Sequence, residues 1–126
     1  NMIAHCQVLI WAEGFTLGVK AGVEPEALRQ AVLNGIVGQA LALKYTIPEF
    51  VFKGDFDTVR FALNLMRKDV GLATELARQV NVPLKIANIG EQELIECLAR
   101  GWGERDSWMP FTLQEERANV KVRRSL

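Results

Sequence analysis

The stretch "NLMRKDVGLATELAR", residues 64–78, decides the fold, because it is the longest strongly amphipathic segment of the chain. At about 100° per residue, an α-helix places the large apolar side chains of this region in one narrow arc. That arc predicts the face that the helix buries, and it consists of Phe61, Leu65, Leu72 and Leu76. The side chains predicted to lie opposite it are polar, namely Arg60, Asn64, Arg67, Thr74 and Arg78.

Two charged residues interrupt the apolar arc. Asp69 falls inside it and Lys68 lies on its edge. Adjacent residues of a helix do not face each other, so the pair is predicted to find its partners elsewhere rather than to neutralise itself. One interpretation is that both residues meet charges of another helix, or that Lys68 reaches water along its stem. The other is that they line a polar cleft, in which the Lys68 ammonium meets an anion.

Glycine and proline delimit helices in the first third of the chain. A first helix is predicted over about residues 1–21 and ends at Gly22. A second one has Pro25 at its first position and Gly35 past its end. The pattern then weakens, and residues 36–45 are the only further helical candidate before the long helix.

The long helix itself has recognisable limits. Pro48 is expected to break any helix before it, and Asp57 is expected to cap the start of the long helix. The helix is predicted over residues 58–80 and closed by Asn81 and Pro83.

Two more helices complete the pattern. One runs over residues 83–99 and stops at Gly101, and the last one is capped by Asp106 or Ser107. The only β-like run, "FVFK", is short and isolated. The predicted fold is therefore all-α, with five or six helices packed around a long central helix in a single domain of residues 1–126.

Composition excludes several classes of function. The 126 residues balance 15 basic against 15 acidic side chains, so no overall charge favours nucleic acid or an anionic membrane, and neither is expected as a partner. The apolar start holds only twelve uncharged residues in a row, too few for a membrane span. Cys6 and Cys97 suit free thiols of a reducing compartment, and the cytoplasm is the predicted location.

Metal and nucleotide motifs are also missing. His5 is the single histidine, and with two distant cysteines it forms no zinc set, so no metal is expected. The segment "GWGERD" has two suitably spaced glycines but follows a helix rather than a strand, so it is not a dinucleotide-binding fingerprint. Glu13 interrupts the apolar first helix and is expected to be part-buried in a structural role.

Three segments in a fixed order carry a family resemblance: "NMIAHCQVLIWAEGFTLGVKAGVEP", "FALNLMRKDVGLATELA" and "GWGERDS". They resemble the C-terminal helical domain of the β-hydroxyacid dehydrogenases, the family of 3-hydroxyisobutyrate dehydrogenase and tartronate semialdehyde reductase in the 6-phosphogluconate dehydrogenase superfamily. The likeness spans nearly the whole chain. It implies that domain's fold.

The resemblance assigns roles to individual residues. Asn1 matches the Asn of a K-x-x-x-N motif that holds the substrate, and the general acid/base Lys would stand four positions before it, so this chain carries no catalytic residue. Phe61 and Lys68, within an F-x-x-x-L-x-x-K-D motif, are implied to face the cofactor. Asp69 and Glu13 are implied to be structural supports. Gly101, Gly103 and Asp106 match the family's G-x-G-x-x-D pattern.

The function that the resemblance implies belongs to a longer enzyme. This chain would be the substrate-binding and oligomerisation domain of an NAD- or NADP-dependent oxidoreductase that converts a small β-hydroxy acid to its semialdehyde, or the reverse. It would lack the Rossmann domain that mainly binds the cofactor, and would be inactive alone. A homo-oligomer formed through apolar helices is expected in any case, because the predicted helix over residues 1–21 has too few polar positions to face water. Two alternatives stay open: a free-standing helical interaction module, and a relative with changed chemistry such as an imine reductase.

Overall fold

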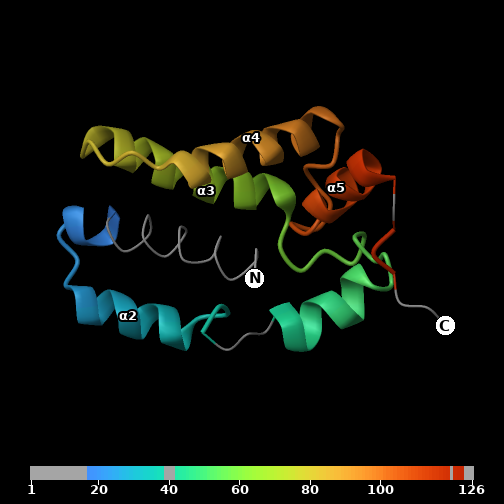
Figure 1. The fold of residues 1–126 in the computed structure, drawn as a ribbon, viewed down its shortest axis with the longest axis horizontal. Coiled ribbons are helices and arrows are strands. Elements are labelled where there is room, and N and C mark those ends of the chain that lie inside the picture. The colour runs from blue at the N-terminus through green and yellow to red at the C-terminus, as the bar shows by residue number, and fades with distance from the viewer. Residues whose placement is uncertain (1–16, 39–41, 120, 124–126) are drawn as a thin grey trace.

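The computed structural model describes residues 17–38, 42–119 and 121–123 (Figure 1). Residues 17–20 are helical, and the further elements in chain order are α2 (Pro25–Asn34), the π-helix η1 (Ala42–Val51), α3 (Leu63–Gln79), α4 (Lys85–Ala99) and α5 (Pro110–Ala118). Over these ranges there is no strand, only one isolated bridge between Ala62 and Asp106. The predicted all-α fold is confirmed.

Left-handed residues end three of the helical segments where the sequence predicted an end. Gly22 has φ of 94° and Gly101 has φ of 79°, values that glycine adopts without a steric penalty. Asn81, with φ of 58°, follows α3, and asparagine is the side-chain-bearing residue that tolerates this conformation best. The local sequence alone therefore sets these boundaries.

The second helix also begins as predicted. Pro25 is the first residue of α2, where its missing N–H costs no hydrogen bond. The preceding Glu24 supplies the cap, because its Oε2 accepts a hydrogen bond of 2.9 Å from the Ala27 N–H. Gly35 follows the last helical residue, in an extended conformation.

The prediction that Pro48 breaks the chain's helical path was wrong, because this residue lies inside η1. Proline removes an amide donor that the α-helical pattern requires. A π-helix, with bonds between residues i and i+5, lacks the same donor at Pro48, yet η1 continues past that position. η1 also starts later than the predicted helix over residues 36–45 and ends at Val51, which is fully buried.

The long helix begins later than predicted, at Leu63 instead of residue 58. Asp57 does not cap it. Asp55 instead accepts a hydrogen bond of 3.0 Å from the Thr58 N–H, which forms a separate turn. α3 ends at Gln79, within one residue of the prediction.

The core lies where α3, α4, α5 and the end of η1 meet, and in Figure 1 α3 and α4 run side by side. Its buried members are Val51, Phe56, Leu63, Leu94, Cys97, Met109 and Leu113. Trp102 and Trp108 pack against this cluster, and Trp11 lies outside the described residues.

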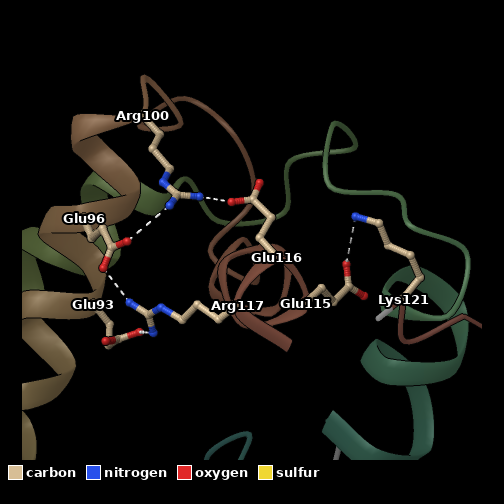
Figure 2. A network of polar contacts seen from close by, with 7 residues as sticks. All are labelled: Glu93, Glu96, Arg100, Glu115, Glu116, Arg117 and Lys121. Atoms are coloured by element: carbon tan, nitrogen blue, oxygen red, sulfur yellow. Dashed lines mark hydrogen bonds and ion pairs between the residues drawn. The ribbon is translucent and has the colours of Figure 1, made fainter. Parts of the chain in front are cut away.

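Ion pairs fasten α5 to α4 (Figure 2). Arg117 on α5 contacts Glu93 of α4 at 2.6 Å and also pairs with Glu96. Arg100, directly after α4, bridges Glu96 and Glu116. All these side chains are roughly 35–43% exposed, so each ion pair alone contributes little to stability. Because the pairs share residues, they act as one network.

Candidate functional site

The apolar arc of α3 is exposed, so the prediction that it forms the buried face was wrong. Its four large side chains have exposed fractions of 42% for Phe61, 44% for Leu65, 58% for Leu72 and 38% for Leu76. We call these four side chains, together with Lys68 and Asp69, the exposed stripe, and Phe61 precedes the first residue of α3, Leu63.

The buried face of α3 lies elsewhere on the helix, at Leu63, Thr74 and Ala77, with Met66 and Val70 packed against the core. At 100° per residue the centre of this face is about 150° from the centre of the exposed stripe. α3 therefore has two apolar faces, and α4 covers only one of them. Periodicity located the larger side chains, but it carried no information on which face α4 packs against.

Thr74 sits on the packed face although the sequence placed it on the polar side. Its hydroxyl donates to Glu91 Oε2 of α4 at 2.8 Å. Arg67 approaches the other oxygen of the same carboxylate at 3.3 Å. The polar side of α3 thus packs against α4, because Glu91 of α4 supplies the acceptor that the buried Thr74 hydroxyl needs.

Lys68 and Asp69 pair with each other, which corrects the prediction that adjacent residues would not. Lys68 Nζ lies 3.1 Å from Asp69 Oδ1, and the two side chains are 60% and 56% exposed. The long lysine stem bends across the helix surface to its neighbour, a geometry that helix periodicity alone does not anticipate. Asp69 is therefore no buried anchor for another segment.

The exposure of this pair decides what Lys68 can do. An ion pair between two exposed side chains is worth at most about 1 kcal/mol, because water screens the charges and ordering the side chains costs entropy. An incoming anion therefore competes with Asp69 at small cost. The ammonium stands beside apolar surface and remains accessible to solvent.

The start of α3 is joined to the 101–107 loop by backbone hydrogen bonds. The N–H groups of Leu63 and Asn64 donate to the carbonyls of Arg105 and Gly103, both at 2.9 Å. In return the Ser107 N–H donates to the Phe61 carbonyl at 2.8 Å. This pairing replaces a side-chain cap, which α3 lacks, and it holds Phe61 in place.

A buried charge pair reinforces this junction. Asp106, 1% exposed, accepts hydrogen bonds from the Arg60 backbone N–H at 2.9 Å and from its guanidinium at 3.1 and 2.6 Å. The same guanidinium lies 3.6 Å from the centre of the Phe50 ring, a cation–π contact with η1. Arg60 and Asp106 are named here the junction pair.

Asp106 does not cap the last helix, contrary to the prediction. Its Oδ1 accepts from the Trp108 N–H at 3.1 Å, while α5 begins after Met109 without a side-chain cap. Sequence reasoning missed the junction pair because 46 residues separate its members. The only signal was indirect: Arg60 adjoins one family motif and Asp106 belongs to another.

Other predicted site residues lie outside the described residues, namely Asn1 and Glu13. Among the residues that the structure describes, no group of three His, Cys, Asp or Glu side chains gathers to hold a metal ion. A search of the same residues finds no helix with the length and apolar character to cross a membrane.

Comparison with known proteins places the chain in a family. A family model described as NAD-binding of NADP-dependent 3-hydroxyisobutyrate dehydrogenase matches residues 1–110. The 2-(hydroxymethyl)glutarate dehydrogenase of Eubacterium barkeri is 32% identical over 97% of this chain, and the match covers 40% of that enzyme. The human mitochondrial 3-hydroxyisobutyrate dehydrogenase is 28% identical over 92% of this chain and 36% of its own length.

A structural neighbour supports the fold. An imine reductase from Pseudomonas sp. superposes with a TM-score of 0.76 at 17% sequence identity, over 90% of this chain and 39% of that one. The chain thus spans about two fifths of the length of the relatives that it matches. On the family model and the dehydrogenase relatives together, the chain belongs to the 3-hydroxyisobutyrate dehydrogenase family of β-hydroxyacid dehydrogenases.

Proposed function

We propose that this chain is the C-terminal helical domain of a longer NAD(P)-dependent oxidoreductase, one that interconverts a small β-hydroxy acid and its semialdehyde. Relatives whose names specify dehydrogenation of hydroxy acids support the reaction class. The share of those relatives that the chain covers supports its role as one domain of two. In this proposal the Rossmann domain precedes Asn1 and holds most of the dinucleotide.

The observation that carries the proposal is the exposed stripe of α3, with its accessible ammonium. A dinucleotide presents anionic phosphates and apolar ring faces, and the stripe offers the Lys68 ammonium next to Leu65, one turn earlier on the helix, with Phe61 also exposed. The residues present therefore fit that class of ligand. When bound, the nicotinamide supplies the hydride acceptor or donor of the reaction.

The chain's own residues have distinct tasks in this scheme. Lys68 exchanges its weak contact with Asp69 for an anionic oxygen, and Asp69 keeps the free lysine close to the helix. Phe61 contributes apolar surface, and the junction pair fixes its backbone. Asn1 is assigned to the substrate hydroxy acid, and a lysine four positions before it to proton transfer.

Substitution of Lys68 in the full-length enzyme tests this proposal. We expect Lys68→Gln to raise KM for NAD(P) about tenfold, the loss of one charge-assisted hydrogen bond, and to leave kcat at saturating cofactor within about twofold. Steady-state kinetics at varied cofactor concentration measure both quantities.

Lys53→Gln is the matched control. Lys53 is 61% exposed and pairs with a single carboxylate, that of Glu49, so it resembles Lys68 in exposure and partner but lies on the chain after η1. Equal KM values for wild type and Lys68→Gln would refute the role of Lys68. A KM that rises equally in Lys53→Gln would assign the effect to net charge.

The isolated chain provides a second test. Mixed with 3-hydroxyisobutyrate and NAD or NADP, it should yield no reduced cofactor, because the groups assigned to cofactor binding and proton transfer lie mostly before Asn1. Turnover by the chain alone would refute the division into two domains. We further propose that the enzyme is cytoplasmic and uses either NAD or NADP.

Self-association is the remaining part of the proposal. Apolar side chains are exposed on several segments besides α3, including Ile36 and Val37 at 66% and 62% and Ile89 of α4 at 66%. Such surface favours a homo-oligomer. Sedimentation velocity at high concentration should show a dimer or larger species, and a monomer alone would contradict the expectation.

A further inference from the structure

Glu115 is a buried carboxylate on the side of α5 away from α4 (Figure 2). Its side chain is 1% exposed, and its partners are Lys121 at 3.6 Å, the Val122 N–H at 2.8 Å and the Arg123 guanidinium, with Arg123 Nη2 at 3.2 Å. These three residues lie a few positions after the end of α5 at Ala118. Glu115 and residues 121–123 therefore form a closed contact, which we call the tail latch.

Electrostatics favours the closed latch. Burial pushes the pKa of Glu115 upward, but hydrogen bonds from the Val122 N–H and the Arg123 guanidinium outweigh it, so the pKa lies below its usual value. The carboxylate is therefore ionised at neutral pH, and it holds the tail against α5 by charge-assisted hydrogen bonds.

Arg123 carries the latch beyond α5. Its Nη1 donates to the Val51 carbonyl at the end of η1 at 3.2 Å, and its guanidinium lies 5.6 Å from the centre of the Phe56 ring. Gly54 leaves room for this approach, since a Cβ there would stand 2.6 Å from Arg123 Nε. The guanidinium thus contacts both ends of the turn that follows η1.

Phe56 connects this turn to the candidate site. It is 2% exposed, and its carbonyl accepts a hydrogen bond of 3.0 Å from the Asp106 N–H. Asp106 in turn binds Arg60, and the Ser107 N–H binds the Phe61 carbonyl. A continuous series of contacts therefore leads from Glu115 through Arg123 and Phe56 to the junction at the start of α3.

We propose that Glu115 is a positioning residue for the start of α3, acting through Arg123 and Phe56. The effect of Glu115 on cofactor binding rests on the proposed function, because the residue held at the start of α3 is Phe61 of the exposed stripe. The position of the junction itself depends on neither cofactor nor substrate. It is therefore testable on the chain alone.

Amide hydrogen exchange, followed by NMR on the 126-residue chain, is the experiment. In Glu115→Gln we expect the junction amides to exchange about tenfold faster than in wild type: those of Leu63, Asn64 and Ser107, which join the start of α3 to the loop, and that of Asp106, which binds the Phe56 carbonyl. Amides within α4, such as Asn88, should stay within about twofold. Arg123→Met removes the other member of the same ion pair and should give the same pattern. Arg123 lies outside α5 and its side chain is 29% exposed, so this variant leaves the helix itself unchanged.

Glu116→Gln is the matched control. Glu116 is the next residue of the same helix, but it is 43% exposed and pairs with Arg100 toward α4 (Figure 2). The junction amides of this variant should match wild type. The double variant Glu115→Gln/Arg123→Met should exchange no faster than the single ones, because both substitutions break one path.

Three outcomes would overturn the inference: unchanged junction amides in both single variants, equal acceleration of the α4 amides, and additive effects in the double variant. Equal acceleration throughout the chain would show that the latch serves overall stability alone. In the full-length enzyme, Glu115→Gln should raise KM for NAD(P) several-fold at unchanged kcat. The exchange result stands apart from the Lys68→Gln result, so failure of the latch and failure of the proposed function are distinguishable.

Discussion

Two faces of α3 carry apolar side chains, but only one of them is buried. One face places Leu63, which is fully buried, against the core, and the other leaves Leu65, two residues later, 44% exposed. The difference lies in the partners. On the packed face, Glu91 of α4 accepts a hydrogen bond from the Thr74 hydroxyl. On the exposed stripe, Lys68 and Asp69 pair with each other and are exposed to solvent. Apolar periodicity marks a face as suitable for burial, and complementary polar groups determine which face is buried.

The junction pair should have the largest effect on this comparison, because it sets where α3 starts. Asp106→Asn leaves the Arg60 guanidinium without its buried carboxylate, and we expect the free energy of unfolding to fall by about 3 kcal/mol. Urea unfolding followed by tryptophan fluorescence measures the change. The control Asp57→Asn removes a carboxylate that is 80% exposed, the partner of Arg105, and should cost less than about 1 kcal/mol. Equal losses would show that burial of Asp106 has no energetic weight.

The next prediction compares the faces directly. Leu63→Ala creates a cavity in the core and should lower the free energy of unfolding by about 2–3 kcal/mol. Leu72→Ala, the same change on a side chain that is 58% exposed, should lower it by less than about 0.5 kcal/mol. Both values come from the same urea titrations. Similar losses at the two positions would mean that the stripe is packed in solution, and would remove the contrast.

A smaller effect is expected at the tail latch, which lies on neither face. Glu115→Gln should cost about 1–2 kcal/mol at neutral pH, through the loss of hydrogen bonds to a charged group. The folded-state pKa of Glu115 lies below its ordinary value of 4.5, so this stabilisation is complete above pH 4.5 and is lost as pH falls through the lower, folded-state pKa. Unfolding curves of wild type and variant should therefore converge in acid. If the difference in unfolding free energy between wild type and variant widened as pH fell, the lowered pKa of Glu115 would be contradicted.

Local chemistry explains which parts of the fold the sequence predicted. Gly22, Asn81 and Gly101 end helices through their own conformational preferences, and Pro25 begins one in the same way. Pro48 inside η1 was not predictable from the local pattern, and the segment has contacts from outside it, such as the hydrogen bond from Arg123 to the Val51 carbonyl. Another is the cation–π contact of Arg60 with Phe50 of η1.

The candidate site was predictable in part. The motif pattern singled out Lys68 and Phe61, and in the structure both side chains are exposed, at 60% and 42%. It did not reveal that Asp69 pairs with Lys68, since rotamers of two exposed side chains decide that contact. It also did not reveal the contact of Arg60 with Asp106, because no periodic rule relates residues in a loop to residues 46 positions away.

The capping of α3 has an electrostatic consequence. All four leading amides of the helix are engaged: Leu63 and Asn64 bind loop carbonyls, and Leu65 and Met66 bind the Ala62 carbonyl. The partial positive charge of this terminus is thus consumed within the protein, and no backbone nest remains there for a phosphate. Attraction for anions must come from the Lys68 side chain, and dissolved salt screens the field of that charge. Affinity for a negatively charged ligand at this surface should consequently decline as ionic strength rises.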